Sequence, residues 1–133
     1  MNGRQKLKRE ILIAEDDWAL SGALKKLVES FGYNVTHVVG TVEDGIAVAQ
    51  SHTFDGALLD VALAIGRVWP LANLLSERGV PYILMTGDPD AGKYTFCKGC
   101  RCIPKTRLVR TIRTELACLF PDDMLDPKDT GGK

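Results

Sequence analysis

The chain lacks a long hydrophobic run and a net charge, and both absences limit what it can do. No apolar stretch approaches the roughly 20 residues of a transmembrane helix. The basic start "GRQKLKR" does not resemble a signal peptide, so we expect a cytoplasmic protein without a membrane anchor. The 17 Lys and Arg residues balance 17 Asp and Glu residues, for a formal net charge of +0. No global field therefore draws the chain to nucleic acid or to a membrane surface.

Cysteine and histidine are scarce. The sequence has four cysteines, Cys97, Cys100, Cys102 and Cys118. In a cytoplasmic chain we expect reduced thiols. The spacing "CKGC" is typical of a zinc or redox pair, but a closed zinc site needs four ligands, and His37 and His52 belong to other predicted elements. We expect small buried or half-exposed thiols, and a zinc or thiol-redox module remains an alternative.

The length of 133 residues suits one domain with its own core. Internal repeats and low-complexity segments are absent. We expect an ordered domain over 9–120, a flexible amino-terminal segment over 1–8, and a polar, flexible tail over 121–133. The tail is too short for a DNA-binding or catalytic module, so the sequence predicts a domain that acts alone.

Two kinds of hydrophobic periodicity alternate along the chain. Short apolar runs predict strands at 10–15, 34–39, 55–61, 80–87 and 101–104. Helical spacing predicts helices at 18–32, 41–52, 68–79 and 107–120. Residues 88–100 have no clear helical period, so a fourth helix there would be short or irregular. The alternation predicts an α/β fold, a doubly wound five-stranded parallel sheet.

Several residues mark the ends of these helices. Asp17 and Thr41 are placed to cap helices with their side-chain oxygens, and Glu43 and Asp44 suit the first turn of the second helix. Gly32 is placed to end the first helix.

Polar side chains follow the strands at the edge where sites form in parallel sheets. Glu15 and Asp16 follow the first strand, Asp60 ends the third, Thr86 ends the fourth, and Lys105 follows the fifth. Carboxylates repel one another and are tolerated together where a divalent cation holds them. Oxygen ligands without His or Cys favour Mg²⁺ over zinc. Such a pocket suits phosphoryl transfer to a carboxylate.

These residues also carry a family resemblance. The motifs "ILIAEDD", "ALLDVAL", "ILMTGD" and "CIPK" stand in the order found in the receiver domains of two-component response regulators. The chain resembles the compact, single-domain receivers of alphaproteobacteria, with the flavodoxin-like or CheY-like (βα)5 fold, over roughly residues 9–120.

The resemblance implies a role for each residue of the pocket. Asp60 would accept the phosphoryl group, and Thr86 and Lys105 would bind its oxygens. The Mg²⁺ ligands would be Glu15, Asp16, Asp60 and the backbone carbonyl of Ala62.

The sequence departs from the receiver pattern in two places. A proline usually follows the lysine, whereas here Pro104 precedes Lys105 and Thr106 follows it, so the lysine could be aimed differently. The aromatic switch residue usually lies three positions before the lysine, where this chain has Cys102. Tyr94 and Phe96 lie nearby in the sequence and are candidates to replace it.

The resemblance also implies partners. A histidine kinase or a histidine phosphotransfer protein would donate the phosphoryl group, and a downstream protein would read it. No nucleic-acid or membrane partner is expected, and because receivers often pair through their fourth or fifth helix, a homodimer is one expectation. The main alternative is a pseudo-receiver that binds partners without phosphorylation. A phosphatase with Asp60 as nucleophile normally needs a second aspartate two residues later, where this chain has Ala62.

Overall fold

Five short strands form one sheet in which all neighbouring strands run parallel. In this computed structural model the described residues are 8–63, 67–87 and 101–121. The strands are β1 (Glu10–Ala14), β2 (Asn34–Val39), β3 (Gly56–Asp60), β4 (Tyr82–Thr86) and β5 (Arg101–Pro104). Their order across the sheet is β2-β1-β3-β4-β5. This is the flavodoxin-like order, so the predicted fold class is confirmed.

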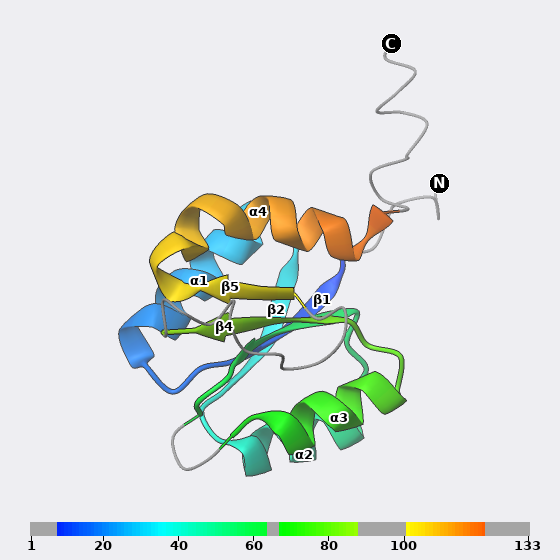
Figure 1. The fold of residues 1–133 in the computed structure, drawn as a ribbon. Helices are drawn as coiled ribbons and strands as arrows, with labels where there is room; N and C mark the ends of the chain where they lie inside the picture. Colours follow the sequence, from blue (N-terminus) through cyan, green and yellow to red (C-terminus); the bar gives the residue numbers. More distant parts are fainter. Residues whose placement is uncertain (1–7, 64–66, 88–100, 122–133) are drawn as a thin grey trace, which may run out of the picture.

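Helices cover both faces of the sheet (Figure 1). Helices α1 (Trp18–Ser30) and α4 (Leu108–Leu119) lie on one face. Helices α2 (Val42–Ser51) and α3 (Trp69–Glu77) lie on the other. A 3₁₀ turn over Lys105–Arg107 leads from β5 into α4. The fourth helix considered at 88–100 falls outside the described residues.

The helix ends follow the predicted signals. The side chain of Asp17 accepts a hydrogen bond from the Leu20 amide at 3.1 Å, and Thr41 accepts one from the Asp44 amide at 3.1 Å. The chain leaves α1 through Gly32 at φ +98°, and leaves α3 through Gly79 at φ +73°. Glycine is favoured in this left-handed region because it has no Cβ to clash with the backbone.

The core has two parts, one on each side of the sheet. Strand β3 is buried along its whole length, and four residues of β1 are buried, as expected for strands covered on both faces. Successive side chains point to opposite faces, so Leu58 packs toward α1 and α4 while Leu59 packs toward α2 and α3. This packing fixes the register of β1 and β3, and with it the residues that follow their carboxyl ends.

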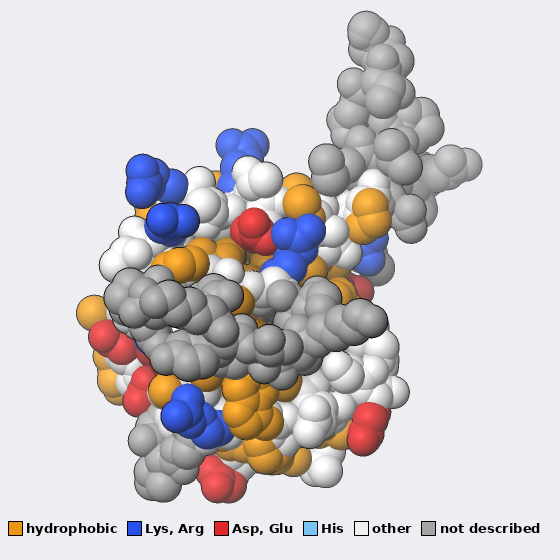
Figure 2. Space-filling view, viewed as in Figure 1, with side chains coloured by type: hydrophobic (Ala, Val, Ile, Leu, Met, Phe, Trp, Pro, Cys, Tyr) orange, Lys and Arg blue, Asp and Glu red, His pale blue; other side chains and the backbone are white. Residues whose placement is uncertain are grey.

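Charge is distributed unevenly over the surface. Figure 2 shows Lys and Arg side chains gathered at the top of the molecule, where Figure 1 places α4, whose exposed arginines are Arg110 and Arg113. Among the described helices, none is long and apolar enough to cross a membrane.

Candidate functional site

The predicted carboxylates converge where β1 and β3 end. Asp60 is the last residue of β3, and Glu15 directly follows β1, its neighbour in the sheet. Oxygen atoms of Glu15, Asp16 and Asp60 all lie within 4.8 Å of one another. Strand order reverses between β1 and β3, because β2 lies on one side of β1 and β3–β5 lie on the other. The cluster therefore occupies the switch point at which ligands bind in doubly wound sheets.

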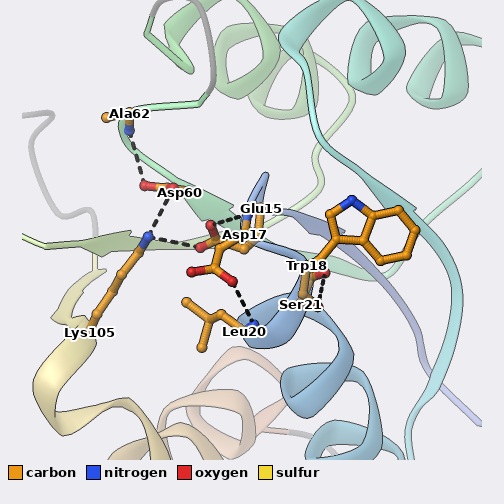
Figure 3. A network of polar contacts seen from close by, with 8 residues as sticks. All are labelled: Glu15, Asp17, Trp18, Leu20, Ser21, Asp60, Ala62 and Lys105. Atoms are coloured by element: carbon orange, nitrogen blue, oxygen red, sulfur yellow. Dashed lines mark hydrogen bonds and ion pairs between the residues drawn. The ribbon is translucent and has the colours of Figure 1, made fainter.

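Lys105 lies between the two buried carboxylates (Figure 3). Its Nζ donates a hydrogen bond to Oδ2 of Asp60 at 3.0 Å and forms an ion pair with Oε1 of Glu15 at 2.9 Å. Glu15 and Asp60 are each only 3% exposed, so water screens this contact weakly. The 3₁₀ turn that follows β5 carries the lysine to this position.

The backbone holds the other carboxylate oxygens. The Ala62 amide donates to Oδ1 of Asp60 at 3.1 Å, and the Asp17 amide donates to Oε2 of Glu15 at 3.0 Å. These two hydrogen bonds orient the carboxylate groups of Asp60 and Glu15. Oε1 of Glu15 is different: it is buried, and among the described residues no donor reaches it with hydrogen-bond geometry, so the ion pair with Lys105 is its contact.

Burial and charge shift two ionisation equilibria at the site. Burial raises the pKa of Glu15 above its usual 4.5, and the nearby charge of Asp60 adds to the rise, while the Asp17 amide and Lys105 oppose it. Burial alone would lower the pKa of Lys105, but its close contacts with the carboxylates of Glu15 and Asp60 outweigh that effect and raise the pKa above the usual 10.5. The lysine therefore stays an ammonium and balances the clustered carboxylates.

The residues of this cluster fit a divalent cation. All their side-chain donors are carboxylate oxygens, which Mg²⁺ prefers, and Asp16 presents its carboxylate at the exposed side. The buried Oε1 of Glu15 has spare acceptor capacity toward the pocket. The cluster could thus hold a metal ion through Glu15, Asp16 and Asp60. The carbonyl of Ala62, which the resemblance implied as a backbone ligand, stays a prediction.

Thr86 ends β4 on the other side of Asp60. It is buried, with 6% of its surface exposed, and pairs in the sheet with Pro104, the residue before Lys105. The preceding residue of β4, Met85, pairs with Asp60. The sheet therefore brings Thr86 to the same edge as the lysine and the carboxylates.

Although the residues on either side of Lys105 differ from the usual receiver pattern, its side chain still points to Asp60. Lys105 reaches Asp60 with a proline before it and a threonine after it, and no cis peptide bond occurs in the described part of the chain. Cys102 lies on β5 beside Leu84, half-buried, and burial raises the pKa of its thiol. Cys102 and Cys118 are free thiols. Tyr94, Phe96, Cys97 and Cys100 lie outside the described residues.

The sequence did not predict two further features of the described residues, a cavity beside the acidic residues and a contact between two histidines. Trp18 is 91% exposed and lines a cavity of about 340 Å³ together with Glu15, Asp16 and Lys25. His37 and His52 belong to different elements, yet their rings lie 4.3 Å apart. Hydrophobic periodicity places a side chain on a face of one element, but it does not show which elements meet.

One curated protein shares part of this sequence. The chain is 34% identical over 84 residues to the phyllosphere-induced regulator PhyR of Methylorubrum extorquens strain AM1. The match includes 61% of this chain and only 32% of that protein, so the chain spans about a third of its relative. No protein-family model matches the chain.

Solved structures share the fold over most of the chain. SdrG from Sphingomonas melonis Fr1 has a TM-score of 0.74 at 25% identity, covering 86% of this chain and 98% of that one. The receiver domain of PhyR from Erythrobacter litoralis has a TM-score of 0.75 at 23% identity, covering 84% and 89%. A CheY-like receiver domain from Methylobacillus flagellatus has a TM-score of 0.72 at 18% identity, covering 85% and 99%. The structural neighbours of this chain are therefore CheY-like response regulator receiver domains.

Proposed function

We propose that this chain, which has the fold of the CheY-like response regulator receiver domains, accepts a phosphoryl group on Asp60 and signals by contact with other proteins. The donor would be a histidine kinase or a histidine phosphotransfer protein of a two-component phosphorelay. The chain would act as a switch or relay in the cytoplasm rather than as an enzyme on an external substrate.

A single arrangement carries this proposal. Lys105 Nζ lies 3.0 Å from Asp60 and 2.9 Å from Glu15, in a cluster whose three carboxylates approach within 4.8 Å. One of these groups can act as nucleophile, since a carboxylate attacks phosphorus readily once it is aligned. The ammonium and the remaining carboxylates have the complementary tasks of binding phosphoryl oxygens and a cation.

The placement of these side chains supports the following course for the transfer. A carboxylate oxygen of Asp60 attacks the phosphorus of the donor's phosphohistidine, and the P–N bond breaks as the P–O bond forms. The electron pair stays on the imidazole nitrogen, which takes a proton from water. Lys105, already bonded to Asp60, donates to the transferred oxygens, and the hydroxyl of Thr86 bonds another. Magnesium held by Glu15, Asp16 and Asp60 would supply charge neutralisation for the phosphoryl oxygens.

The signal passed to a downstream protein would arise from the new charge at Asp60. A phosphoryl group there attracts Thr86 and Lys105, which belong to β4 and the turn before α4. A change at these two residues reaches the surface near β5 and α4. A downstream protein would read that surface. The half-buried Cys102 replaces the usual aromatic residue, so the coupling would run through smaller movements on β5.

The test uses a small-molecule donor with the same type of P–N bond, phosphoramidate. With Mg²⁺ present, we expect intact-mass analysis to show one added phosphoryl group on the wild-type chain. Asp60→Asn should remain unlabelled, because its amide is a poor nucleophile. Lys105→Gln keeps the acceptor but removes the ammonium, so we expect slower labelling. Chelation of Mg²⁺ should prevent labelling of the wild type.

Two outcomes would contradict the proposal. Equal labelling of the wild type and Asp60→Asn would exclude Asp60 as the acceptor. A folded wild type that is never labelled, by phosphoramidate or by a phosphorylated kinase, would favour the pseudo-receiver alternative. Tryptophan fluorescence gives a separate check on cation binding, because Trp18 lines the cavity beside Asp16; the response should disappear in Asp16→Ala.

A further inference from the structure

Both histidines of the chain meet at a place away from the carboxylate cluster. The sequence has 2 histidines, His37 on β2 and His52 directly after α2. Their ring centres lie 4.3 Å apart, and the ring planes are tilted by 56°. Strand β2 is an edge strand, and β1 separates it from β3 and Asp60. The proposed phosphorylation site uses neither ring.

A relay of hydrogen bonds fixes the tautomer of His37. The hydroxyl of Thr36 donates its one proton to Oε1 of Glu10 at 3.0 Å. Nδ1 of His37 lies 3.1 Å from the same hydroxyl oxygen. Because that hydroxyl has already given its proton to a carboxylate, it accepts from the ring. Nδ1 of His37 therefore carries the N–H, and Nε2 keeps the lone pair.

His52 is held in the same way by the end of α2. The hydroxyl of Ser51 donates to the carbonyls of Ala47 at 3.1 Å and Val48 at 3.3 Å. Nδ1 of His52 lies 2.9 Å from this hydroxyl oxygen, so the ring nitrogen is again the donor and Nε2 keeps the lone pair. Within the part of the chain that the structure describes, no hydrogen bond engages the Nε2 atom of either ring.

The surroundings support one ring and leave the other open to solvent. The ring of His37 meets Phe54 edge-on at 5.7 Å, and Phe54 is only 4% exposed. His52 is exposed and borders a cavity of about 500 Å³ that Pro121 also lines. A small ion can therefore reach the pair from solvent.

We propose that Nε2 of His37 and Nε2 of His52 together bind a late first-row divalent cation, such as Ni²⁺ or Zn²⁺, with water at its other positions. Neutral imidazole nitrogen suits these ions, whereas Mg²⁺ prefers oxygen. Metal-binding histidines usually donate their second ring N–H to a polar partner, as both rings do here.

The spacing of the rings fits a shared ion. Two imidazoles that bind one ion at N–metal distances of about 2.1 Å have ring centres about 4.5–5.3 Å apart. The observed 4.3 Å needs only a small opening to reach that range. The bound ion would tie β2 to the end of α2.

Calorimetric titration of the untagged chain with Ni²⁺ tests the proposal. Excess Mg²⁺ is present to compete at the carboxylate cluster. We expect one saturable site in the wild type. Its affinity should fall about tenfold or more in His37→Gln and in His52→Gln, since losing a ligand costs at least as much as losing a partner of that ligand. Asp16→Asn, the control at the carboxylate cluster, should bind Ni²⁺ as the wild type does.

A second set of variants tests the role of the two hydroxyls. Thr36→Val and Ser51→Ala keep both imidazoles but remove the acceptors that hold each Nδ1–H. We expect Ni²⁺ affinity to fall about tenfold in each. In NMR spectra of the wild type, the paramagnetic ion should broaden the ring protons of both histidines at the same concentration.

Three outcomes would overturn the proposal. Unchanged Ni²⁺ affinity in both glutamine variants would assign the ion to carboxylates or thiols. A loss in only one of them would assign it to a single imidazole. A wild type that binds no Ni²⁺ would reduce the contact between the rings to packing. His52 is exposed, so His52→Gln keeps the test usable even where His37→Gln lowers stability.

Discussion

Lys105 balances the negative charge of the candidate site. It is the one described cation in contact with both Glu15 and Asp60, two carboxylates that are almost fully buried. Like charges at this separation repel strongly in a poorly solvated pocket, so a counter-charge is needed in the absence of a metal. The lysine supplies it in the structure described, and a divalent cation would share the task when bound.

The raised pKa of Glu15 leads to a prediction about pH. Burial makes the folded state bind a proton more readily than the unfolded chain, whose Glu15 titrates near 4.5. Between that value and the raised pKa, the folded state holds more protons, so the contribution of Glu15 to stability falls as the pH rises. Glu15→Gln removes this loss, so its unfolding free energy in chelator, measured relative to that of the wild type, should rise as the pH increases from 4.5 toward the raised pKa of Glu15, and level off above it.

The measurement is urea unfolding at a series of pH values, with the two proteins compared at each. The difference between them isolates Glu15 from other titrating groups. A constant difference across the range, or one that shrinks toward neutral pH, would show that the buried carboxylate does not carry this penalty.

At the scale of elements, the short stretch after β1 divides its carboxylates between two tasks. Glu15 and Asp16 belong to the carboxylate cluster with Asp60, while the side chain of Asp17 caps α1 by accepting a hydrogen bond from the Leu20 amide. The cap satisfies an amide that would otherwise lack a partner at the helix start. Adjacent acidic residues thus serve the site and the helix separately.

This division can be tested with neighbouring substitutions. Asp17→Ala should lower the unfolding free energy by about 1 kcal/mol, the usual cost of losing a cap, and leave Mg²⁺ affinity nearly unchanged. Asp16→Asn should weaken Mg²⁺ binding by about tenfold or more and leave stability in chelator unchanged or higher. Urea unfolding and a fluorescence titration measure the two effects, and an exchange of the two phenotypes would refute the assignment.

Two helix glycines should respond to alanine in opposite directions. Around Gly22 of α1, no atom lies within 4 Å of an added Cβ, so Gly22→Ala should stabilise by about 0.5–1 kcal/mol through helix propensity. At Gly45 of α2, the added Cβ would lie 2.6 Å from Cδ2 of the buried Leu71. There we expect a net loss of about 1–2 kcal/mol, because overpacking between α2 and α3 exceeds the propensity gain. Thermal and urea unfolding of both variants give the comparison.

At the scale of the whole molecule, the sheet links the candidate site to global stability. The carboxylates follow β1 and β3, the central strands of the fold, so a cation bound between them stabilises the folded state over the unfolded chain. Mg²⁺ at 100 times its dissociation constant should raise the unfolding free energy by about 2.7 kcal/mol. Asp16→Asn should show little of this increase at the same concentration. Equal stabilisation of both proteins would mean that Mg²⁺ acts elsewhere.

Much of the fold could be predicted because its signals are local. Apolar runs and helical spacing located the five strands and four α-helices of the described residues to within a few positions, and the caps at Asp17 and Thr41 followed from side-chain chemistry alone. The grouping of Glu15, Asp16 and Asp60 was also predictable, because parallel strands bring their carboxyl ends to one edge. The catalytic and metal-binding roles of these residues stay predictions.

The amino-acid sequence by itself determined which segments become strands and helices, and which polar residues follow the strands, since both depend on neighbours along the chain. Only the tertiary structure decided that Lys105 bridges Glu15 and Asp60, that His37 meets His52, and that a cavity opens beside Pro121. These contacts depend on how the connections after β5, α2 and α4 pack against other elements. Long-range packing of this kind leaves no periodic signal in the residues that take part.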